Sequence, residues 1–358
     1  MDLVLTKTFD LLDICRSTLI KIFVRNDLLK EIFRNRSLRI ILGFSAALIF
    51  NLVVSVCFPL WVLLVGPILF GTPHLISSLR YIPYITISKK ILKLDFYLYF
   101  FSLMLTIFIF KLVQDHYFPI QNPQISKFNN LELLSFFASL IIFILIYPQE
   151  SKIFRMLFLG LTIGGALIKY PILSPGIFLL FHNFVAFIYW IKSSQKISDK
   201  LIAIFSALIF LILNYFIFMG LFDFIYQWVH LQNFLNFGQM NALEIGKNIV
   251  AWETNYNLFI HATIAYAFGQ SLHYFIWIKV IPQLNHYHHV SPSFKMSYKI
   301  LKRDFKFLLI PISSLMILGS TFWFWIDLST ARNIYFALAL FHGFFELAGL
   351  GLIKSHEF

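Results

Sequence analysis

The feature that most constrains this chain is a series of long apolar segments separated by short, basic connections. Each segment is long enough to cross a bilayer as a helix, and we count about ten of them on the criterion of roughly 20 residues per span. Hydrophobic residues make up 59% of the chain and charged residues only 13%, too little polar surface to cover a water-soluble globule of 358 residues. The segments are 40–56, 58–79, 95–113, 131–147, 154–169, 174–191, 201–222, 256–278, 307–326 and 334–353.

Lysine and arginine orient these segments, because the cytoplasmic loops of membrane proteins are enriched in both residues. Most of the 29 fall in alternate connections, which assigns to the cytoplasm segments 1–39, 80–93, 148–155, 192–200, 279–306 and the tail after 353. The exceptions, in outer loops, are Lys111, Lys127, Lys169, Lys247 and Arg332. The pattern predicts an all-α, polytopic transmembrane helix bundle with cytoplasmic N and C termini. We expect a multi-pass integral protein of the bacterial inner (cytoplasmic) membrane.

The expected domain organisation is simple. Residues 1–37 mix apolar with charged, mostly basic, positions and are predicted to be an amphipathic segment in the cytoplasmic interface rather than a cleavable signal peptide. Residues 38–358 are predicted to form a single transmembrane helical domain. The net charge of +12 resides in the connections between spans. The expected partners are therefore the lipid membrane and an apolar molecule from the bilayer, and not nucleic acid. Cys15 and Cys57 are assigned to opposite sides of the membrane and cannot pair.

Ionisable side chains inside spans are costly and usually functional. The predicted spans contain His74, His182, His261, His273, His342 and Glu346. All lie on spans that run from the outside inward, so their depths are comparable. Without His261, they fall within about 10 Å along the membrane normal at the rise of an α-helix. His261 precedes His273 by about 120° of helix rotation, so we assign it to an outer polar contact.

Imidazole and carboxylate groups at one depth predict a metal site. His342 and Glu346 are four residues apart and share one helix face, an arrangement that suits iron, manganese or zinc in helical bundles. We take His74, His182, His273, His342 and Glu346 as candidate metal ligands, with Glu346 also the candidate catalytic residue. The alternative is that each histidine only hydrogen-bonds across a helix contact. The same alternatives, metal or solvated loop, hold for the inner-loop residues His286, His288 and His289.

Two further patterns concern the second and eighth spans. Gly66, Pro67, Gly71 and Pro73 predict a broken helix immediately before His74, and freed carbonyls at such a break are tolerated where they line a cavity. Both spans also read His, five residues, a basic residue, two residues and Pro, starting at His74 and His273. The basic residue and the proline are expected wherever a helix reaches the inner face with a snorkelling cation. The matched histidines are not explained in this way, and they allow an internal duplication of the two spans.

The stretch Gly71-Thr72-Pro73-His74 resembles the start of the first histidine motif in the Brp/Blh family of membrane β-carotene 15,15'-dioxygenases. The resemblance implies a multi-helix bundle in which intramembrane histidines hold a non-haem iron that cleaves β-carotene with oxygen. That family also has a His-x3-His pair on a late helix, where this chain has His342-x3-Glu346. The family continues its first motif with Gly and then Asp, where this chain has Leu75 and Ser77.

The leading functional hypothesis is a membrane enzyme of the oxygenase type, with non-haem iron in a buried His/Glu site and a lipid, isoprenoid or carotenoid as substrate. A second class is electron transfer through b-type haem, with His182 and His342 as axial ligands at one depth. A third is a transporter, with the broken second span and the intramembrane histidines forming an ion or substrate site.

Overall fold

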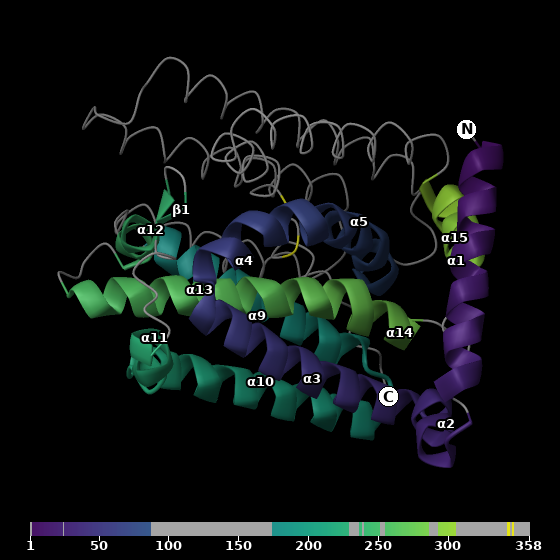
Figure 1. The fold of residues 1–358 in the computed structure, drawn as a ribbon, viewed down its shortest axis with the longest axis horizontal. Coiled ribbons are helices and arrows are strands. Elements are labelled where there is room, and N and C mark those ends of the chain that lie inside the picture. The colour runs from purple at the N-terminus through teal and green to yellow at the C-terminus, as the bar shows by residue number, and fades with distance from the viewer. Residues whose placement is uncertain are drawn as a thin grey trace, which may run out of the picture.

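The computed structural model describes residues 2–23, 25–86, 174–228, 236–237, 240–250, 255–285, 293–305, 342–343 and 346. These residues are almost entirely helical (Figure 1), which confirms the all-α expectation. The elements are α1 (Asp2–Phe23), α2 (Asp27–Arg34), α3 (Arg36–Cys57), α4 (Pro59–Gly66), η1 (Pro67–Gly71), α5 (Thr72–Thr86), α9 (Ser174–Ser193), α10 (Ile197–Phe218), α11 (Asp223–Trp228), α12 (Ala242–Ile249), α13 (Tyr256–Phe275), η3 (Ile276–Val280), α14 (Ile281–Asn285) and α15 (Phe294–Phe305). A two-residue antiparallel pair, β1 (Asn236–Phe237) and β2 (Met240–Asn241), joins α11 to α12.

Two of the described helices, α3 and α10, are long and apolar enough to cross a membrane. The helices on either side of η1 make a third candidate if they count as one bent span. The count of ten spans is therefore not established and stays a prediction. The predicted spans at 95–113, 131–147, 154–169 and 307–326, and most of 334–353, lie outside the described residues.

The exposed faces of α3 and α10 are strongly apolar. Large apolar side chains that are a third to two thirds exposed recur along both helices, among them Ile49, Phe50, Leu201, Phe205 and Ile212. Such wide apolar surface is rare on soluble monomers and marks a surface that is covered by membrane or protein. The described part of the chain thus has apolar helix faces that a membrane could cover.

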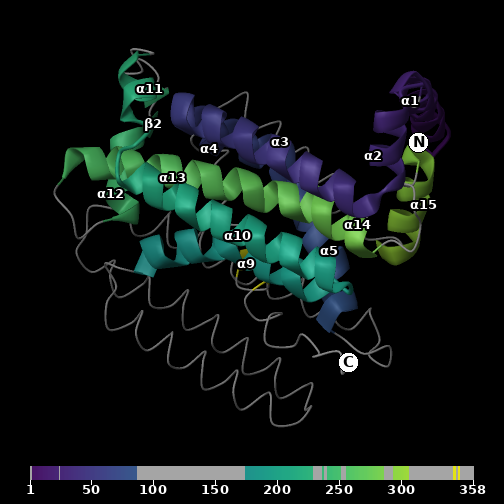
Figure 2. The same ribbon diagram turned by 90° about the horizontal axis from the view of Figure 1, so that it is seen from below.

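Helix α13 forms the centre of the bundle. It packs against α3, α4, α9, α10 and α12, and Figures 1 and 2 show it enclosed between them. Small residues allow this close packing: a Cβ atom on Gly269 would lie 2.8 Å from Asn183 Nδ2 of α9, and one on Gly246 of α12 would lie 1.8 Å from the carbonyl oxygen of Phe259. Because α13 is surrounded by other helices, its polar residues His261, Thr263, Gln270 and His273 are buried within the protein.

The ends of α3 follow from its sequence. The Asn35 side chain caps the helix by accepting a hydrogen bond from the Leu38 N–H at 3.2 Å, and the helix ends just before Pro59, which has no N–H to continue it. At the start of α3, the carboxylate of Asp199, in the first turn of α10, accepts hydrogen bonds from Arg36 at 2.8 Å and from Ser37 at 2.7 Å. This buried carboxylate holds the starts of α3 and α10 together.

The broken helix predicted before His74 is present. After α4 the backbone passes through the π-helical segment η1, and the flanking helices are bent by 52°. A second π-helical segment, η3, continues α13 from Ile276, three residues after His273. Both histidine-bearing helices are thus irregular within a few residues of the histidine, where a local change of helical pitch redirects the side chains that follow.

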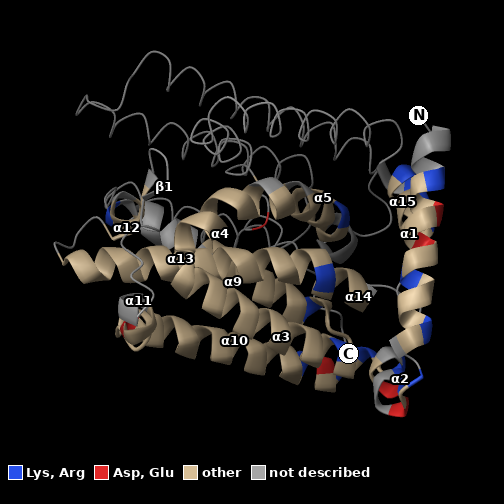
Figure 3. Cartoon of the chain, viewed as in Figure 1, with Lys and Arg blue, Asp and Glu red and all other residues tan. Residues whose placement is uncertain are grey.

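Charged residues gather at one end of the described bundle. In Figure 3 lysine and arginine are most frequent near α1, α2, the start of α3 and the end of α13. Helix α1 lies there too and runs across the direction of α3, α10 and α13 (Figure 1). The boundary drawn at residue 37 between an interfacial segment and a transmembrane domain, and the cytoplasmic assignment of both termini, remain predictions.

Candidate metal centre

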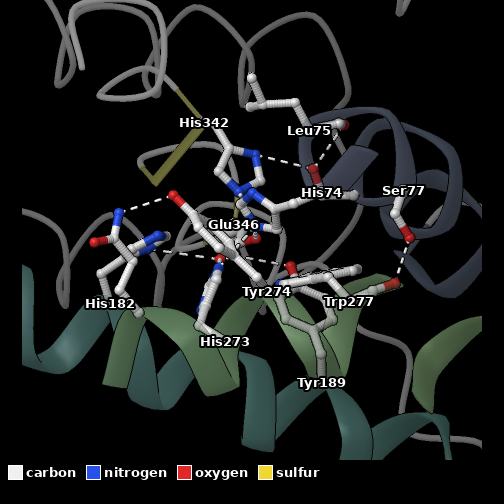
Figure 4. A network of polar contacts seen from close by, with 12 residues as sticks. His74, Leu75, Ser77, His182, Tyr189, His273, Tyr274, Trp277, His342 and Glu346 are labelled. Atoms are coloured by element: carbon white, nitrogen blue, oxygen red, sulfur yellow. Dashed lines mark hydrogen bonds and ion pairs between the residues drawn. The ribbon is translucent and has the colours of Figure 1, made fainter. Parts of the chain in front are cut away.

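Four separate parts of the chain meet at the site shown in Figure 4. His74 comes from the first turn of α5, His182 from the middle of α9, and His273 from the last turns of α13. His342 and Glu346 come from the C-terminal part of the chain and lie one helical turn apart. The five side chains that sequence analysis grouped by depth are therefore brought together in space.

Three imidazole nitrogens lie unusually close to one another. Nε2 of His74 is 2.8 Å from Nε2 of His273 and 2.9 Å from Nε2 of His342, while Oε1 of Glu346 is 2.7 Å from Nε2 of His342. The other carboxylate oxygen, Oε2, is 3.5 Å from Nε2 of His273. Two nitrogens bound about 2.1 Å from one ion at right angles would be about 3.0 Å apart, so these spacings match ligands that share an ion.

Protons alone do not account for these contacts. The oxygen of the Ser78 hydroxyl lies 2.9 Å from the carbonyl oxygen of Leu75, to which it donates, and 2.9 Å from Nδ1 of His342. Nε2 of His74 has at most one proton for two nitrogen neighbours, and a shared cation removes this conflict.

The carboxylate of Glu346 is the costliest group in the site. The residue is fully buried, and neither carboxylate oxygen has a hydrogen-bond donor among the described residues. A buried carboxylate without a donor or a cation costs at least several kcal/mol. The Tyr189 hydroxyl donates instead to the backbone carbonyl of Glu346 at 2.8 Å, which fixes the backbone and leaves the carboxylate to the histidines.

His74, His273, His342 and Glu346 can together hold a metal ion. One ligand atom from each lies within 4.8 Å of all the others, and all four residues are buried. Imidazole nitrogens with one carboxylate suit iron, manganese, cobalt and zinc. The arrangement supplies a charge that offsets part of a divalent ion, and a surrounding from which water is largely excluded.

His182 stands at the edge of this group. Its Nδ1 is 3.6 Å from Oε2 of Glu346, and its ring centroid is 4.5 Å from that of His273. Its side chain is 16% exposed, against 1% for His273 and 0% for Glu346. His182 is thus not a member of the four-residue group, and it lines the more open side of the site.

The other singled-out residues have separate partners. Nε2 of His261 lies 2.9 Å from Oδ1 of Asp223 on α11, so this histidine, twelve residues before His273 on α13, makes a polar contact of its own. The Gln270 amide donates to the Tyr274 hydroxyl at 2.8 Å, and the Arg80 guanidinium lies over the Tyr81 ring. His286, His288 and His289 lie outside the described residues.

Two residues of the site, Ser78 and Tyr189, were not predicted from the sequence. Ser78 lies four residues after His74, on the same helix face, and this spacing was the signal that could have identified it. Tyr189 lies seven residues, or about two helical turns, after His182 and so shares its helix face. Ser77, where the resembled family has Asp, donates to the backbone carbonyl of Trp277 and so joins α5 to η3.

The fold and the site together define a helical protein that has helices long and apolar enough to cross a membrane and a buried His/Glu group that can hold a metal ion. No protein-family model, no curated protein and no solved structure matches the chain.

Proposed function

We propose that this protein is a membrane-embedded, metal-dependent enzyme of the oxygenase type that uses non-haem iron. The observation that carries the proposal is the convergence of three imidazole nitrogens and one carboxylate in the interior of an apolar bundle. Iron held by histidine and carboxylate, with coordination positions left open, is the usual arrangement for oxygen activation without haem. The resemblance of Gly71–His74 to the first histidine motif of membrane carotenoid dioxygenases supports the same chemistry.

The protein's own residues would have distinct tasks in such an enzyme. His74, His273 and His342 would hold the ion, with Ser78 fixing the orientation of the His342 ring. Glu346 would balance the charge of the ion and complete the ligand set. When bound, the iron would supply the activation of dioxygen for attack on an unactivated carbon–hydrogen or carbon–carbon bond.

The surroundings of the site favour an apolar substrate. Aromatic rings stand against the histidines: the Tyr274 ring centroid is 4.9 Å and the Trp277 ring centroid 6.5 Å from that of His74. Trp277 in turn packs against Tyr189 at 5.0 Å. Walls of this kind exclude water and bind lipid, isoprenoid or carotenoid molecules through buried area rather than hydrogen bonds. We therefore propose that the substrate enters from the bilayer.

The haem alternative has less support in this geometry. Axial ligation by His182 and His342 needs a porphyrin plane between the two rings. The Glu346 carboxylate contacts both of them, at 3.6 Å and 2.7 Å, and occupies the space that the porphyrin would need. The transporter alternative keeps its support from the bent helix before His74, and it differs from the enzyme in requiring no resident metal.

The test is the metal content and spectroscopy of the full-length protein in lipid nanodiscs. We expect about one iron per chain, no Soret absorption band, and a high-spin iron–nitrosyl EPR signal when nitric oxide is added to the reduced protein as a probe of an open coordination position. The matched control is His261→Ala, which removes a buried histidine outside the site. Zinc as the only bound metal, a Soret band, or full substrate accumulation in proteoliposomes after chelation would overturn the proposal.

A further inference from the structure

Helix α1 is joined to α15 although nearly three hundred residues separate them in sequence. The Phe9 ring packs on the Tyr298 ring with centroids 5.1 Å apart. The Asp13 carboxylate accepts hydrogen bonds from the backbone N–H groups of Phe294, at 2.7 Å, and Lys295, at 3.1 Å. We call these two helices the α1–α15 pair.

The contacts within this pair engage two acidic side chains of α1, Asp10 and Asp13. Asp10 makes an ion pair with Lys295 at 2.8 Å, and Asp13 engages the first N–H groups of α15, where the helix dipole favours an anion. These are the acidic residues of α1 whose side chains the structure describes. The pair also carries exposed basic side chains: Lys7, Lys21, Lys299, Lys302 and Arg303.

The face of α1 opposite α15 is apolar and exposed. Leu11 is 62% exposed, Ile14 61% and Ile22 56%, and Leu19 beside them is 55% exposed. At 100° of rotation per residue these four positions fall within one side of the helix. The residues on the other side, Phe9, Asp13, Arg16 and Ile20, are half-buried. Helix α1 therefore has one face that packs on α15 and one apolar face open to its surroundings.

We propose that the α1–α15 pair binds the anionic phospholipid surface of the membrane, with the apolar face of α1 inserted among the acyl chains and the cations of both helices at the phosphate groups. This interaction is separate from the proposed enzyme activity. The direction of α1 supports it, because α1 runs across α3 and α10 (Figure 1) and so parallel to the plane of a bilayer that those helices cross. A basic, amphipathic surface in that orientation is typical of interfacial helices.

Charge favours lipid over a second copy of the chain as the occupant. A symmetric contact would place the same cations against each other, which opposes association. Anionic headgroups attract each cation near the surface instead. The lipid proposal also needs both helices, because Lys299 and Lys302 come from α15 and the apolar face from α1.

Cys15 offers a direct test, because it is exposed on the apolar side of α1. A spin label is attached to Cys15 in full-length protein carrying Cys57→Ser, in nanodiscs of phosphatidylcholine alone or with phosphatidylglycerol. Accessibility of the label to oxygen and to a polar nickel chelate reports its depth. We expect oxygen accessibility to exceed nickel accessibility several-fold, more so with phosphatidylglycerol. The matched control label, at Ser17→Cys with both native cysteines replaced by serine, lies on another side of α1 and should show the reverse.

A charge variant tests the lipid preference. We expect the triple variant Lys299→Gln, Lys302→Gln and Arg303→Gln to abolish the difference in label accessibility between the two lipid compositions, while the label at Cys15 stays accessible to oxygen in both. The single variant Lys299→Gln, which disturbs the fold less, should halve that difference. A label at Cys15 as accessible to nickel as the one at position 17, in both lipids, would overturn the proposal. So would spin–spin broadening that disappears on dilution with unlabelled protein, because it would make a second copy the occupant.

Discussion

Ser78 orients His342 across a helix contact: its hydroxyl oxygen lies within hydrogen-bonding distance of Nδ1 of the imidazole, at 2.9 Å. We predict that Ser78→Ala weakens metal binding by about 10–100-fold, the usual effect of losing a group that fixes a ligand's orientation. Competition with a chromophoric chelator measures the affinity. Ser206→Ala on α10, which removes another buried serine hydroxyl, is the control and should leave it unchanged. Equal affinities of the two variants would refute this role for Ser78.

Metal binding should depend unequally on the five grouped residues. His273→Ala and Glu346→Gln each remove a member of the four-residue group, and we expect the metal content of the purified protein to fall at least about 10-fold. His182→Ala removes the partly exposed residue at the edge and should reduce the content less than twofold.

Elemental analysis of purified variants decides this, with His261→Ala as the control that keeps its metal. If His182→Ala loses as much metal as His273→Ala, the site includes a fifth ligand and the ion lies closer to α9 than the four-residue group implies.

Gly246 and Gly43 should respond in opposite ways to alanine. A Cβ at Gly246 would lie 1.8 Å from a backbone carbonyl oxygen, whereas one at Gly43 meets nothing within 4 Å. We predict that Gly246→Ala lowers the free energy of unfolding by about 1–3 kcal/mol, because two helix backbones must separate. Gly43→Ala should raise it by about 0.5–1 kcal/mol through helix propensity. Thermal unfolding in detergent compares the two, and a neutral Gly246→Ala would contradict the close approach of α12 to α13.

The α1–α15 pair should come apart in acid. Burial acts to raise the pKa of Asp13, but hydrogen bonds from the backbone N–H groups of Lys295 and Phe294 outweigh it and hold the pKa below its ordinary value. A carboxylate with a lowered pKa stabilises the folded state fully above its ordinary pKa of about 4, and this contribution is lost as the pH falls through the lowered value.

The distance between spin labels on Cys15 and on Lys299→Cys, with Cys57→Ser, measures this separation. We expect a single short distance at neutral pH that broadens below about pH 4. Asp13→Asn should broaden the distribution at every pH. A distribution that stays narrow in acid would show that the aromatic contact of Phe9 with Tyr298 is sufficient on its own.

Much of the candidate site was predictable from the sequence because membrane interiors penalise polar side chains. Only a few ionisable residues occur in the apolar segments, and comparing their depths along the membrane normal grouped His74, His182, His273, His342 and Glu346. The break before His74 was also predictable, since glycine and proline cluster there. Depth along one axis does not give adjacency in the plane, however, so the sequence could not say which helices are neighbours.

The sequence by itself determined a helical membrane-associated chain, the residues that must avoid lipid, and the separation of His261 from the other histidines. Only the tertiary structure decided that α5, α9 and α13 meet the C-terminal residues at one point, that Ser78 holds the ring of His342, and that α15 takes up the acidic groups of α1. The physical reason is that helix formation and burial depend on local pattern and apolar content. Contacts between distant segments depend instead on side-chain packing across helices, and the periodicity of one helix carries no information about its neighbour.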